Sequence, residues 1–287
     1  MMRGRTKTPP GLYGIRMPLT RRGVLGLAAA SAVAVLAGCS RALRTSTAAP
    51  SPAVSGDAGT PAAPSASATA ASSPVAPTTA VPAPEPTGPA SEIVRGPATR
   101  PEVALTFHGA GDPGLARELL ALLASRNTVA TVMVVGSWLA ANPSMATAIA
   151  AGGHEFGNHT WTHPALNDLD AAGVRTEVQR CRDVLVSLTG SAGAAFRQSA
   201  AQYSTPLVRE VAGSLGYRTC LSYDIDSLDW TDPAVATVRR SVAAATAGSV
   251  VSLHLGHQVT IDALPGVLDD LAARGLTPVT TTRLLRA

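Results

Sequence analysis

The chain has 287 residues, with 23 basic and 19 acidic side chains and a formal net charge of +4. The basic excess is local, because the first 44 residues carry eight basic side chains and no acidic one, which leaves 15 basic against 19 acidic side chains in the remainder. The part of the chain that can fold is therefore net acidic. This balance argues against nucleic-acid binding, and no nucleic-acid partner is expected.

The N-terminal segment has the features of an export signal. Arg21 and Arg22 precede a short apolar run, and paired arginines at this place are typical of the twin-arginine type. The run, 24–38, is shorter than the roughly 20 residues that a membrane-spanning helix needs. It ends in Leu-Ala-Gly before Cys39, which resembles the bacterial lipobox. We therefore expect residues 1–39 to be an export signal, with a lipidated Cys39 holding the protein at the outer face of the bacterial cell membrane; cleavage nearby with an incidental Cys39 is the alternative.

Residues 40–95 predict a disordered linker. The segment is rich in alanine, proline, serine and threonine, as in TPAAPSASATAASSPVAP. It has too few large apolar side chains to offset the entropy lost on ordering, and its prolines favour extended conformations. Extended chain of this type rises about 3.1 Å per residue, so the linker would reach on the order of 100 Å from a membrane at most.

Residues 96–287 predict one folded domain in which strand-like runs alternate with amphipathic helical patterns. This alternation favours an α/β fold with a mostly parallel sheet, either a small barrel or an open doubly wound sheet. In both architectures functional groups gather at the carboxyl ends of the strands. The strand-like runs are 103–107, 128–135, 154–159, 194–199, 217–223, 249–255 and 276–281, and the clearest helical patterns are 114–125, 176–188, 206–216 and 264–275.

All six histidines lie in or directly after strand-like runs. The strongest local motif is NHTWTHPAL, in which His159 and His163 are four residues apart. On one helical turn this spacing places both imidazoles on the same side, at about the separation that two ligands of one metal require. An isolated pair of this kind is often structural, so its meaning depends on the rest of the chain.

Further polar groups end other strands. Asp224, Asp226 and Asp229 follow the run 217–223, and His254 and His257 follow the apolar run that begins at 249. Burial at such positions shifts pKa values, as it does in active sites.

Two other residues near strand or helix ends have alternative interpretations. Arg197 ends the run 194–199, where it would either brace a carboxylate or reach solvent. Asp232 precedes Pro233, and this pair predicts a helix N-cap followed by proline at the first helical position.

The order of these motifs resembles the polysaccharide deacetylases, the NodB-like group of carbohydrate esterase family four. The resemblance covers residues 100–287 and rests on the histidine, aspartate-tryptophan and leucine-histidine motifs in this order. The matching segments are Thr106-Phe107-His108, His159-Thr160-Trp161-Thr162-His163, Phe196-Arg197, Asp226-Ser227-Leu228-Asp229-Trp230 and Leu253-His254.

The resemblance implies a distorted (β/α)7-type barrel that holds a divalent metal through one aspartate and two histidines. Zinc is expected, with cobalt, nickel or manganese as alternatives. The metal polarises the acetamide carbonyl and activates a water, an aspartate accepts the proton of that water, and a histidine protonates the departing amine. By position, His159 and His163 would be ligands and His254 the general acid, with Asp229 orienting His254 and Arg197 steadying the base.

The stretch ALTFHGAGDPG, 104–114, leaves three assignments open. The family has two adjacent aspartates where this chain has His108 and a Gly-Ala-Gly spacer before Asp112. In the first assignment His108 is the catalytic base and Asp112 completes an Asp-His-His metal site. In the second His108 is a third histidine ligand and Asp112 is the base. In the third Asp112 caps the helix that begins at Pro113.

The sequence as a whole predicts a membrane-tethered, metal-dependent N-deacetylase, acting as a monomer on an N-acetylated glycan such as peptidoglycan or chitin-like oligomers. The alternatives are a non-catalytic glycan-binding domain on the same barrel and the hydrolysis of a different amide or ester. Aromatic residues make up only 3% of the chain, so a short groove is expected. Cys181 and Cys220 are expected to be buried free thiols, since neither has metal-type spacing.

Overall fold

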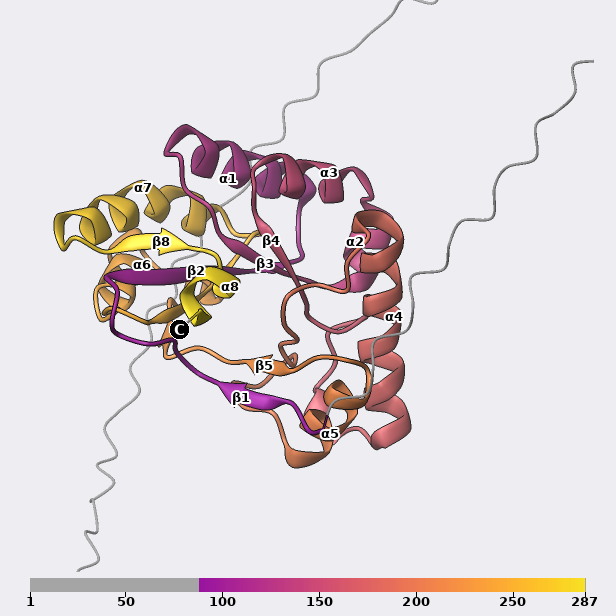
Figure 1. Cartoon of the computed structure of the whole chain (residues 1–287). Coiled ribbons are helices and arrows are strands. Elements are labelled where there is room, and N and C mark those ends of the chain that lie inside the picture. The colour runs from indigo at the N-terminus through magenta and orange to yellow at the C-terminus, as the bar shows by residue number, and fades with distance from the viewer. Residues whose placement is uncertain (1–87, 287) are drawn as a thin grey trace, which may run out of the picture. The chain divides into compact units, whose positions relative to one another are not determined.

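The structure, a computed structural model, describes residues 88–286 (Figure 1). The expected export signal, Cys39 and the linker up to residue 87 lie outside this range. The strands are β1 (Ser91–Ile93), β2 (Glu102–Gly109), β3 (Thr131–Val134), β4 (Glu155–Asn158), β5 (Thr219–Leu221), β6 (Ile225–Asp226), β7 (Val250–His254) and β8 (Thr277–Val279). The α-helices are α1 (Pro113–Ser125), α2 (Gly136–Ala141), α3 (Ser144–Ala151), α4 (Ala171–Thr189), α5 (Pro206–Ser214), α6 (Val235–Val242), α7 (Gln258–Ala273) and α8 (Thr281–Leu285).

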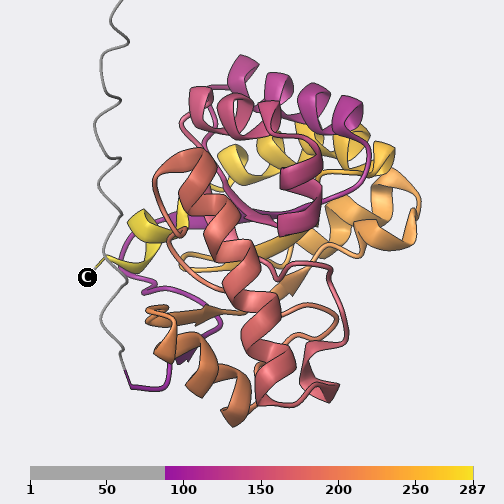
Figure 2. The ribbon, with the colours of Figure 1, turned by 90° about the vertical axis from the view of Figure 1, so that its right-hand side faces the viewer.

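The strands form a distorted parallel barrel, in agreement with the expected fold class. Neighbouring strands follow the order β4-β3-β2-β7-β6, and every pair is parallel. The segment 219–226 closes the ring, because β6 at its end pairs with β7 while β5 at its start is linked to β4, and β1 pairs with the outer edge of β5. Phe196 joins β4 to β5 through single bridges to Asn158 and Cys220. The helices lie around the outside of these strands (Figures 1 and 2).

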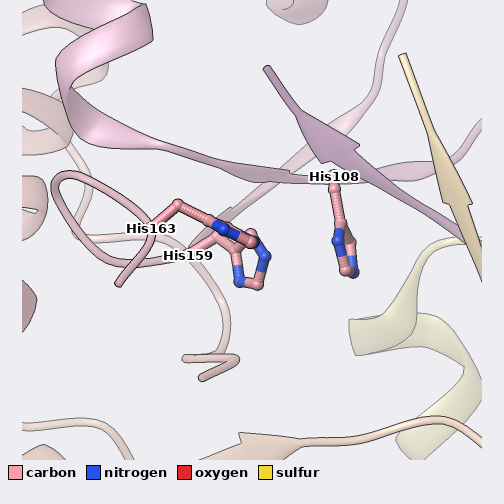
Figure 3. A group of neighbouring side chains, drawn as sticks. All are labelled: His108, His159 and His163. Carbon is pink, nitrogen blue, oxygen red and sulfur yellow. The ribbon is translucent and has the colours of Figure 1, made fainter. Parts of the chain in front are cut away.

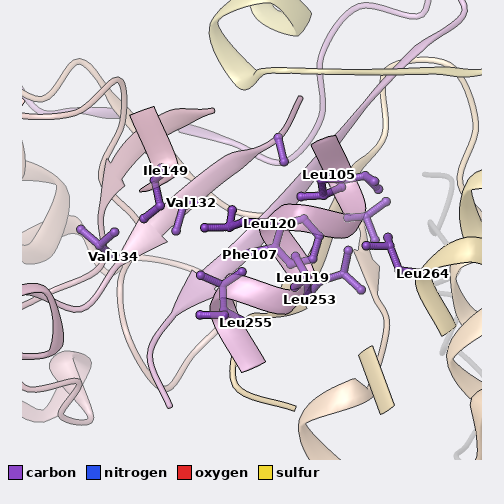
Figure 4. Close-up of a cluster of buried hydrophobic side chains, with 14 of the residues drawn as sticks. Leu105, Phe107, Leu119, Leu120, Val132, Val134, Ile149, Leu253, Leu255 and Leu264 are labelled. Atoms are coloured by element: carbon purple, nitrogen blue, oxygen red, sulfur yellow. The ribbon is translucent and has the colours of Figure 1, made fainter. Parts of the chain in front are cut away.

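Alternation along β2 and β7 separates the packing side chains from the functional ones. Leu105 and Phe107 of β2 and Leu253 of β7 are fully or almost fully buried in the largest apolar cluster, against α1 and α7 (Figure 4). Successive side chains of a strand point to opposite faces, so the residues between them face the barrel interior. The register places His108 of β2 beside His254 of β7 at the carboxyl ends of these strands.

The amino ends of the strands carry two carboxylates with several partners each. Glu102 of β2, which is 6% exposed, accepts hydrogen bonds from Arg100 and Arg283. Glu155 of β4 accepts hydrogen bonds from the hydroxyls of Thr131 and Thr281 and from the backbone N–H of residue 282. Both carboxylates therefore fasten α8 to the start of the barrel.

His154 precedes β4 at the same end of the barrel. Its Nδ1 accepts a hydrogen bond from the backbone N–H of Ala130 at 3.1 Å, and its Nε2 is buried with no hydrogen-bond partner in the described part of the chain. Burial lowers the pKa of His154 below the usual value of a histidine.

The folded part begins earlier than the sequence predicts. Strand β1, Ser91–Ile93, lies within the segment 40–95 that was expected to be linker, and it pairs with β5. A three-residue strand is too short to show an alternating pattern, and its pairing partner lies more than a hundred residues away in the sequence. The predicted boundary between linker and folded domain, near residue 95, therefore lies too far toward the C-terminus.

Other elements also differ from the sequence pattern. Helix α2 lies where no helix was expected, α3 follows Asn142-Pro143, a pair that predicts a helix start, and α7 begins at Gln258, before the predicted start at 264, with Pro265 inside it. The predicted strand 194–199 forms only the single bridges of Phe196. These short or interrupted elements depend on tertiary packing more than on local pattern.

The two cysteines of the described range are free and buried, as expected. Cys181 of α4 belongs to the same apolar cluster as β2, and Cys220 of β5 belongs to a second cluster with Phe196 and Tyr217. Burial raises the pKa of each thiol to about 12. Within residues 88–286 no helix combines the length and the apolar character that crossing a membrane requires.

Candidate active site

A cavity of about 860 Å³ opens at the carboxyl ends of the barrel strands. His108, His163 and His254 line it, together with the aromatic side chains of Trp138, Tyr223 and Trp230. Its other lining residues include one carboxylate, Asp226, and no lysine or arginine. The cavity thus combines apolar walls with a few ionisable groups, which is typical of ligand sites.

Three imidazoles gather beneath this cavity. His108 is the next-to-last residue of β2, His159 directly follows β4 and His163 lies in the next loop (Figure 3). One nitrogen from each ring can be chosen so that all three lie within 4.8 Å of one another. Within the described residues this is the group of histidine, cysteine and acidic side chains that could hold a metal ion.

His159 has the hydrogen-bonding pattern of a metal ligand. Its Nδ1 lies 2.9 Å from the backbone carbonyl of Arg197, and because a carbonyl oxygen only accepts, Nδ1 carries the proton. Its Nε2 is buried and has no hydrogen-bond partner among residues 88–286. Ligating histidines commonly donate their other N–H to a carbonyl or carboxylate in this way. The unpaired nitrogen therefore fits a divalent metal.

The loop that carries His159 and His163 is not the helical turn that their spacing suggested. Thr160 and His163 have φ angles of 67° and 61°, in the left-handed region that residues other than glycine rarely adopt. Glu177 of α4 accepts hydrogen bonds from the backbone N–H groups of Trp161 and Thr162 and from the Thr162 hydroxyl. The two rings, with centroids 4.8 Å apart, are thus brought together by a tight loop that a carboxylate holds.

The three imidazoles are held neutral. Burial, reinforced by the neighbouring histidines, lowers the pKa of His108 and of His159 well below the usual value. Partial burial also lowers the pKa of His163. A neutral imidazole is the form that binds a metal, so the unpaired Nε2 of His159 is ready to act as a ligand at neutral pH, whereas Nε2 of His108 accepts a hydrogen bond from Arg197.

His254 is oriented by a buried carboxylate, as expected. Its Nδ1 lies 2.7 Å from Oδ1 of Asp229, and its backbone N–H donates to Oδ2 of the same carboxylate at 2.8 Å. Thr260 also donates to Asp229. Burial raises the pKa of Asp229, but the hydrogen bonds from His254 and Thr260 outweigh it and hold that pKa below its usual value. The other ring nitrogen, Nε2, remains available to a molecule in the cavity, which His254 lines.

Arg197 is buried and has no carboxylate partner among residues 88–286. The residue is 2% exposed, and its guanidinium donates to the carbonyls of Leu221 and Ser222 and to the hydroxyl of Thr106. Its Nη1 also lies 3.3 Å from Nε2 of His108. Burial lowers the pKa of Arg197 to about 10. The side chain reaches neither solvent nor a carboxylate, so neither of those two interpretations fits; its contact with His108 matches the expected role of steadying the base in the assignment that makes His108 that base.

Asp112 lies at the start of α1 as its N-cap. Its Oδ1 accepts hydrogen bonds from the backbone N–H groups of Gly114 at 2.6 Å and Leu115 at 3.0 Å, with Pro113 at the first helical position. It is not part of the histidine group, which differs from the expectation that it completes an Asp-His-His site. The Gly-Ala-Gly spacer instead packs Gly111 against Gly256, where a side chain at either position would clash with the other's backbone.

A second carboxylate–imidazole pair lies beside His254. His257 Nδ1 is 2.8 Å from Oδ1 of Asp232, and the rings of His254 and His257 have centroids 5.7 Å apart. Asp232 has a φ of 48° and precedes α6 without capping it, because the N-cap of α6 is Ala234. The Asp-Pro pattern suggested the cap, whereas the equal three-residue spacings of the aspartates and the histidines could have indicated the pair.

Comparison with known proteins places these features in a family. The family model for polysaccharide deacetylases matches residues 95–220. A peptidoglycan-N-acetylglucosamine deacetylase from Bacillus cereus is 30% identical over 207 residues, which cover 70% of this chain and 95% of that protein. A chitin deacetylase from Pestalotiopsis sp is 33% identical over 186 residues, which cover 62% of this chain and 61% of that protein.

Solved structures show the same fold. A family four carbohydrate esterase from Streptomyces lividans, in complex with acetate, matches with a TM-score of 0.58 and 27% identity, covering 62% of this chain and 91% of that one. A family four pseudoenzyme from Bacillus anthracis matches with a TM-score of 0.64 and 24% identity, covering 68% of this chain and 69% of that one. The fold is therefore shared by proteins with and without activity.

Proposed function

Because the chain belongs to the polysaccharide deacetylases of carbohydrate esterase family four, we propose that it removes N-acetyl groups from a cell-wall or surface polysaccharide in a metal-dependent reaction. The observation that carries this proposal is the group of His108, His159 and His163 beneath the cavity, with the buried Nε2 of His159 unpaired. The His254–Asp229 pair lies next to it, with the rings of His254 and His108 4.4 Å apart.

The three imidazoles would hold the metal. They are neutral, come from two strand ends and one held loop, and present nitrogen atoms that zinc commonly accepts as ligands. A divalent metal bound there would polarise the acetamide carbonyl and lower the pKa of a bound water. This assignment makes His108 a ligand, the second of the three possibilities that the sequence left open.

His254 would transfer the proton during the reaction. Asp229 holds Nδ1–H of the ring, so Nε2 is free to accept a proton from the attacking water and to deliver it to the departing amine nitrogen. The C–N bond then breaks, with acetate and the free amine as products. Asp229 keeps its negative charge and stabilises the imidazolium that forms between the two transfers.

Two further groups support the reacting centre. Arg197 packs behind His108 and would fix the orientation of that ring. Ala200 lines the cavity with a φ of 57°, an unusual angle for alanine that often accompanies function. A backbone N–H at this place would donate to the developing oxyanion.

The proposed substrate is an N-acetylglucosamine polymer of the peptidoglycan or chitin type. Relatives of both kinds are similar to this chain to nearly the same degree. Trp138, Tyr223 and Trp230 offer faces on which the apolar side of a sugar ring would stack, and the indole N–H of Trp138 is fixed by the carbonyl of Gly111 at 2.8 Å.

A second function, glycan binding without turnover, is favoured by one observation. The strand end that carries an aspartate base in the family carries His108 here, and Asp112 is engaged as a helix cap. With His108 on the metal, His254 would have to act as both base and acid.

Acetate release tests the two functions against each other. The metal-loaded protein is incubated with N-acetylglucosamine oligomers and with peptidoglycan, and acetate and metal content are measured on the same sample. Acetate from either glycan supports the deacetylase. Glycan binding with full metal content and no acetate would select the binding function and overturn the first proposal.

We also propose that the protein is anchored outside the cell membrane through lipidated Cys39. The support is the sequence alone, the paired Arg21-Arg22 and the Leu-Ala-Gly-Cys segment. Cys39→Ser should release the protein from the membrane fraction or leave its leader uncut. Unchanged membrane attachment and unchanged mass would contradict the anchor.

A further inference from the structure

Asp226 places one carboxylate in the cavity, beside the histidines but not among them. It ends β6 and is the one acidic side chain among the described residues that line the cavity. Strand β7 lies between β6 and β2, so Asp226 is two strands away from His108. Neighbouring strands are about 4.8 Å apart, which puts roughly 10 Å between the two backbones. A group bound at Asp226 would therefore lie next to the reacting centre.

The carboxylate of Asp226 is fixed through one oxygen only. Its Oδ1 accepts a hydrogen bond from the backbone N–H of Leu228 at 2.9 Å. None of the ion pairs within residues 88–286 includes Asp226. Its partner in the strand register is Ser252, whose hydroxyl lies 3.4 Å from Nε2 of His108. The second oxygen of a half-buried, oriented carboxylate is thus available to a molecule in the cavity.

Two aromatic side chains line the cavity together with this carboxylate. Burial raises the pKa of Tyr223, and the charge of Asp226 raises it further, so this charge acts on the phenol. Trp230 is 53% exposed and lines the same cavity. Arg197 lies 5.5 Å from the centre of the Tyr223 ring, but it donates to backbone carbonyls and a hydroxyl and not to Asp226. A carboxylate beside aromatic faces is an arrangement that attracts ammonium groups.

We infer that Asp226 binds the ammonium group of a glucosamine unit, so that the protein prefers a glycan from which some acetyl groups have already been removed. The inference rests on the proposed function for the class of glycan. The free amine of a sugar next to the acetylated one would donate to the second oxygen of Asp226, while Tyr223 and Trp230 contact sugar rings. A fully acetylated glycan presents a neutral amide at this place and forms no ion pair.

Binding of two tetramers without acetyl groups to the full chain tests the inference without turnover. The glucosamine tetramer and the glucose tetramer of the same linkage differ in carrying an amine or a hydroxyl at the second carbon of each ring. Titration calorimetry should show about tenfold tighter binding of the glucosamine tetramer, the effect of one hydrogen bond to a charged group. Equal affinity for the two tetramers would overturn the inference.

The variant Asp226→Asn decides whether this carboxylate sets the preference. Asparagine keeps an acceptor for the backbone N–H of Leu228 but has no charge, so the two tetramers should bind within about twofold of each other. Glu118→Gln is the matched control, because Glu118 is an exposed carboxylate of α1 outside the cavity lining, and this variant should keep the preference. A preference retained in Asp226→Asn, or lost equally in Glu118→Gln, would contradict the assignment. Circular dichroism shows whether each variant has folded.

Acetate release locates the ammonium group on the glycan. Tetramers of N-acetylglucosamine with one free amine, placed at each position in turn, are compared with the fully acetylated tetramer. For at least one position, kcat/KM should be about tenfold higher than for the fully acetylated tetramer, and this advantage should disappear in Asp226→Asn. If binding depends on Asp226 but no such tetramer is preferred, the ammonium group belongs to the product, and the preference for a partly deacetylated glycan is wrong.

The outcomes also separate this inference from the proposed function. Binding of the glucosamine tetramer that depends on Asp226, without acetate release from any glycan, leaves the ammonium site intact and removes the deacetylase. Acetate release by a protein that binds both tetramers without acetyl groups equally well keeps the deacetylase and removes the ammonium site.

Discussion

The two ends of the barrel differ in how well their buried and half-buried polar groups are paired, with His154 as the exception at the amino end. At the amino ends of the strands, Glu102 and Glu155 each accept hydrogen bonds from at least two other residues. At the carboxyl ends, His159 has a buried nitrogen with no partner in the described range; Arg197 has hydrogen-bond acceptors there, but its buried charge has no carboxylate beside it among residues 88–286. Satisfied groups stabilise the fold, whereas groups left unsatisfied mark the place where a ligand is expected.

The largest expected effect lies at the carboxyl end, in His254→Ala. Removing the group that transfers the proton should lower the turnover of acetylated oligomers by about two to four orders of magnitude. Metal content should not change, since His254 is not in the ligand group. His257→Ala is the matched control, because it removes an imidazole that is also paired with an aspartate. Loss of metal in His254→Ala would instead make that residue a ligand.

The next effect lies at the amino end, in Glu155→Ala. Two threonine hydroxyls and a backbone N–H lose their acceptor, so the free energy of unfolding should fall by about 2 kcal/mol. Denaturant unfolding measures this change, with the exposed Glu118→Ala as the control. Turnover and metal content of the folded variant should match the unaltered protein. A defect in metal binding would show that the two ends are not independent.

Asp112→Ala should have a smaller effect, although the residue lies near the active site. Loss of the helix cap should destabilise the protein by ~1 kcal/mol. Zinc content and turnover per folded molecule should stay within about twofold, because Asp112 is outside the histidine group. If zinc is lost while the fold is kept, Asp112 is a ligand and the first assignment from the sequence is right.

The smallest expected effect concerns His154. Unlike Glu102 and Glu155 at the same end of the barrel, it has a buried nitrogen with no partner in the described range. Its folded-state pKa is lowered, so the unfolded chain binds more protons between that pKa and about 6.5. Its contribution to stability is therefore full above about pH 6.5 and is lost as the pH falls below it. Denaturant unfolding of the metal-free protein is measured at several pH values. As the pH falls, the free energy of unfolding should decrease less steeply in His154→Gln than in the unaltered protein. Parallel curves would contradict a titrating His154.

The sequence predicts the strands and the histidines better than it predicts the loops. The apolar runs at β2, β3 and β7 identify buried parallel strands, and the carboxyl ends of two of these runs place His108 and His254 at one edge of the sheet, where the register makes them neighbours. The His254–Asp229 pair also follows from the family motifs.

The features that could not be predicted from the sequence depend on contacts between residues far apart in the chain. The choice between capping and ligation for Asp112 depends on where the Gly-Ala-Gly spacer goes, and that path is fixed by the contact between Gly111 and Gly256. The loop around His163 departs from helical geometry because Glu177, more than a dozen residues later, holds its backbone. Strand β1 exists through pairing with β5 alone.

The two buried free cysteines can be used to measure local opening of the fold, because a thiol reagent reaches each one only when the side chains around it move apart. The thiolate is the reactive form, and with a pKa of about 12 almost none is present at neutral pH, so a labelling reagent reacts only after the site opens. Cys181 and Cys220 lie in different apolar clusters. Their separate labelling rates would therefore show whether the cluster that packs α1 and α7 against β2 and the second cluster, around Phe196 and Tyr217, open together or one before the other.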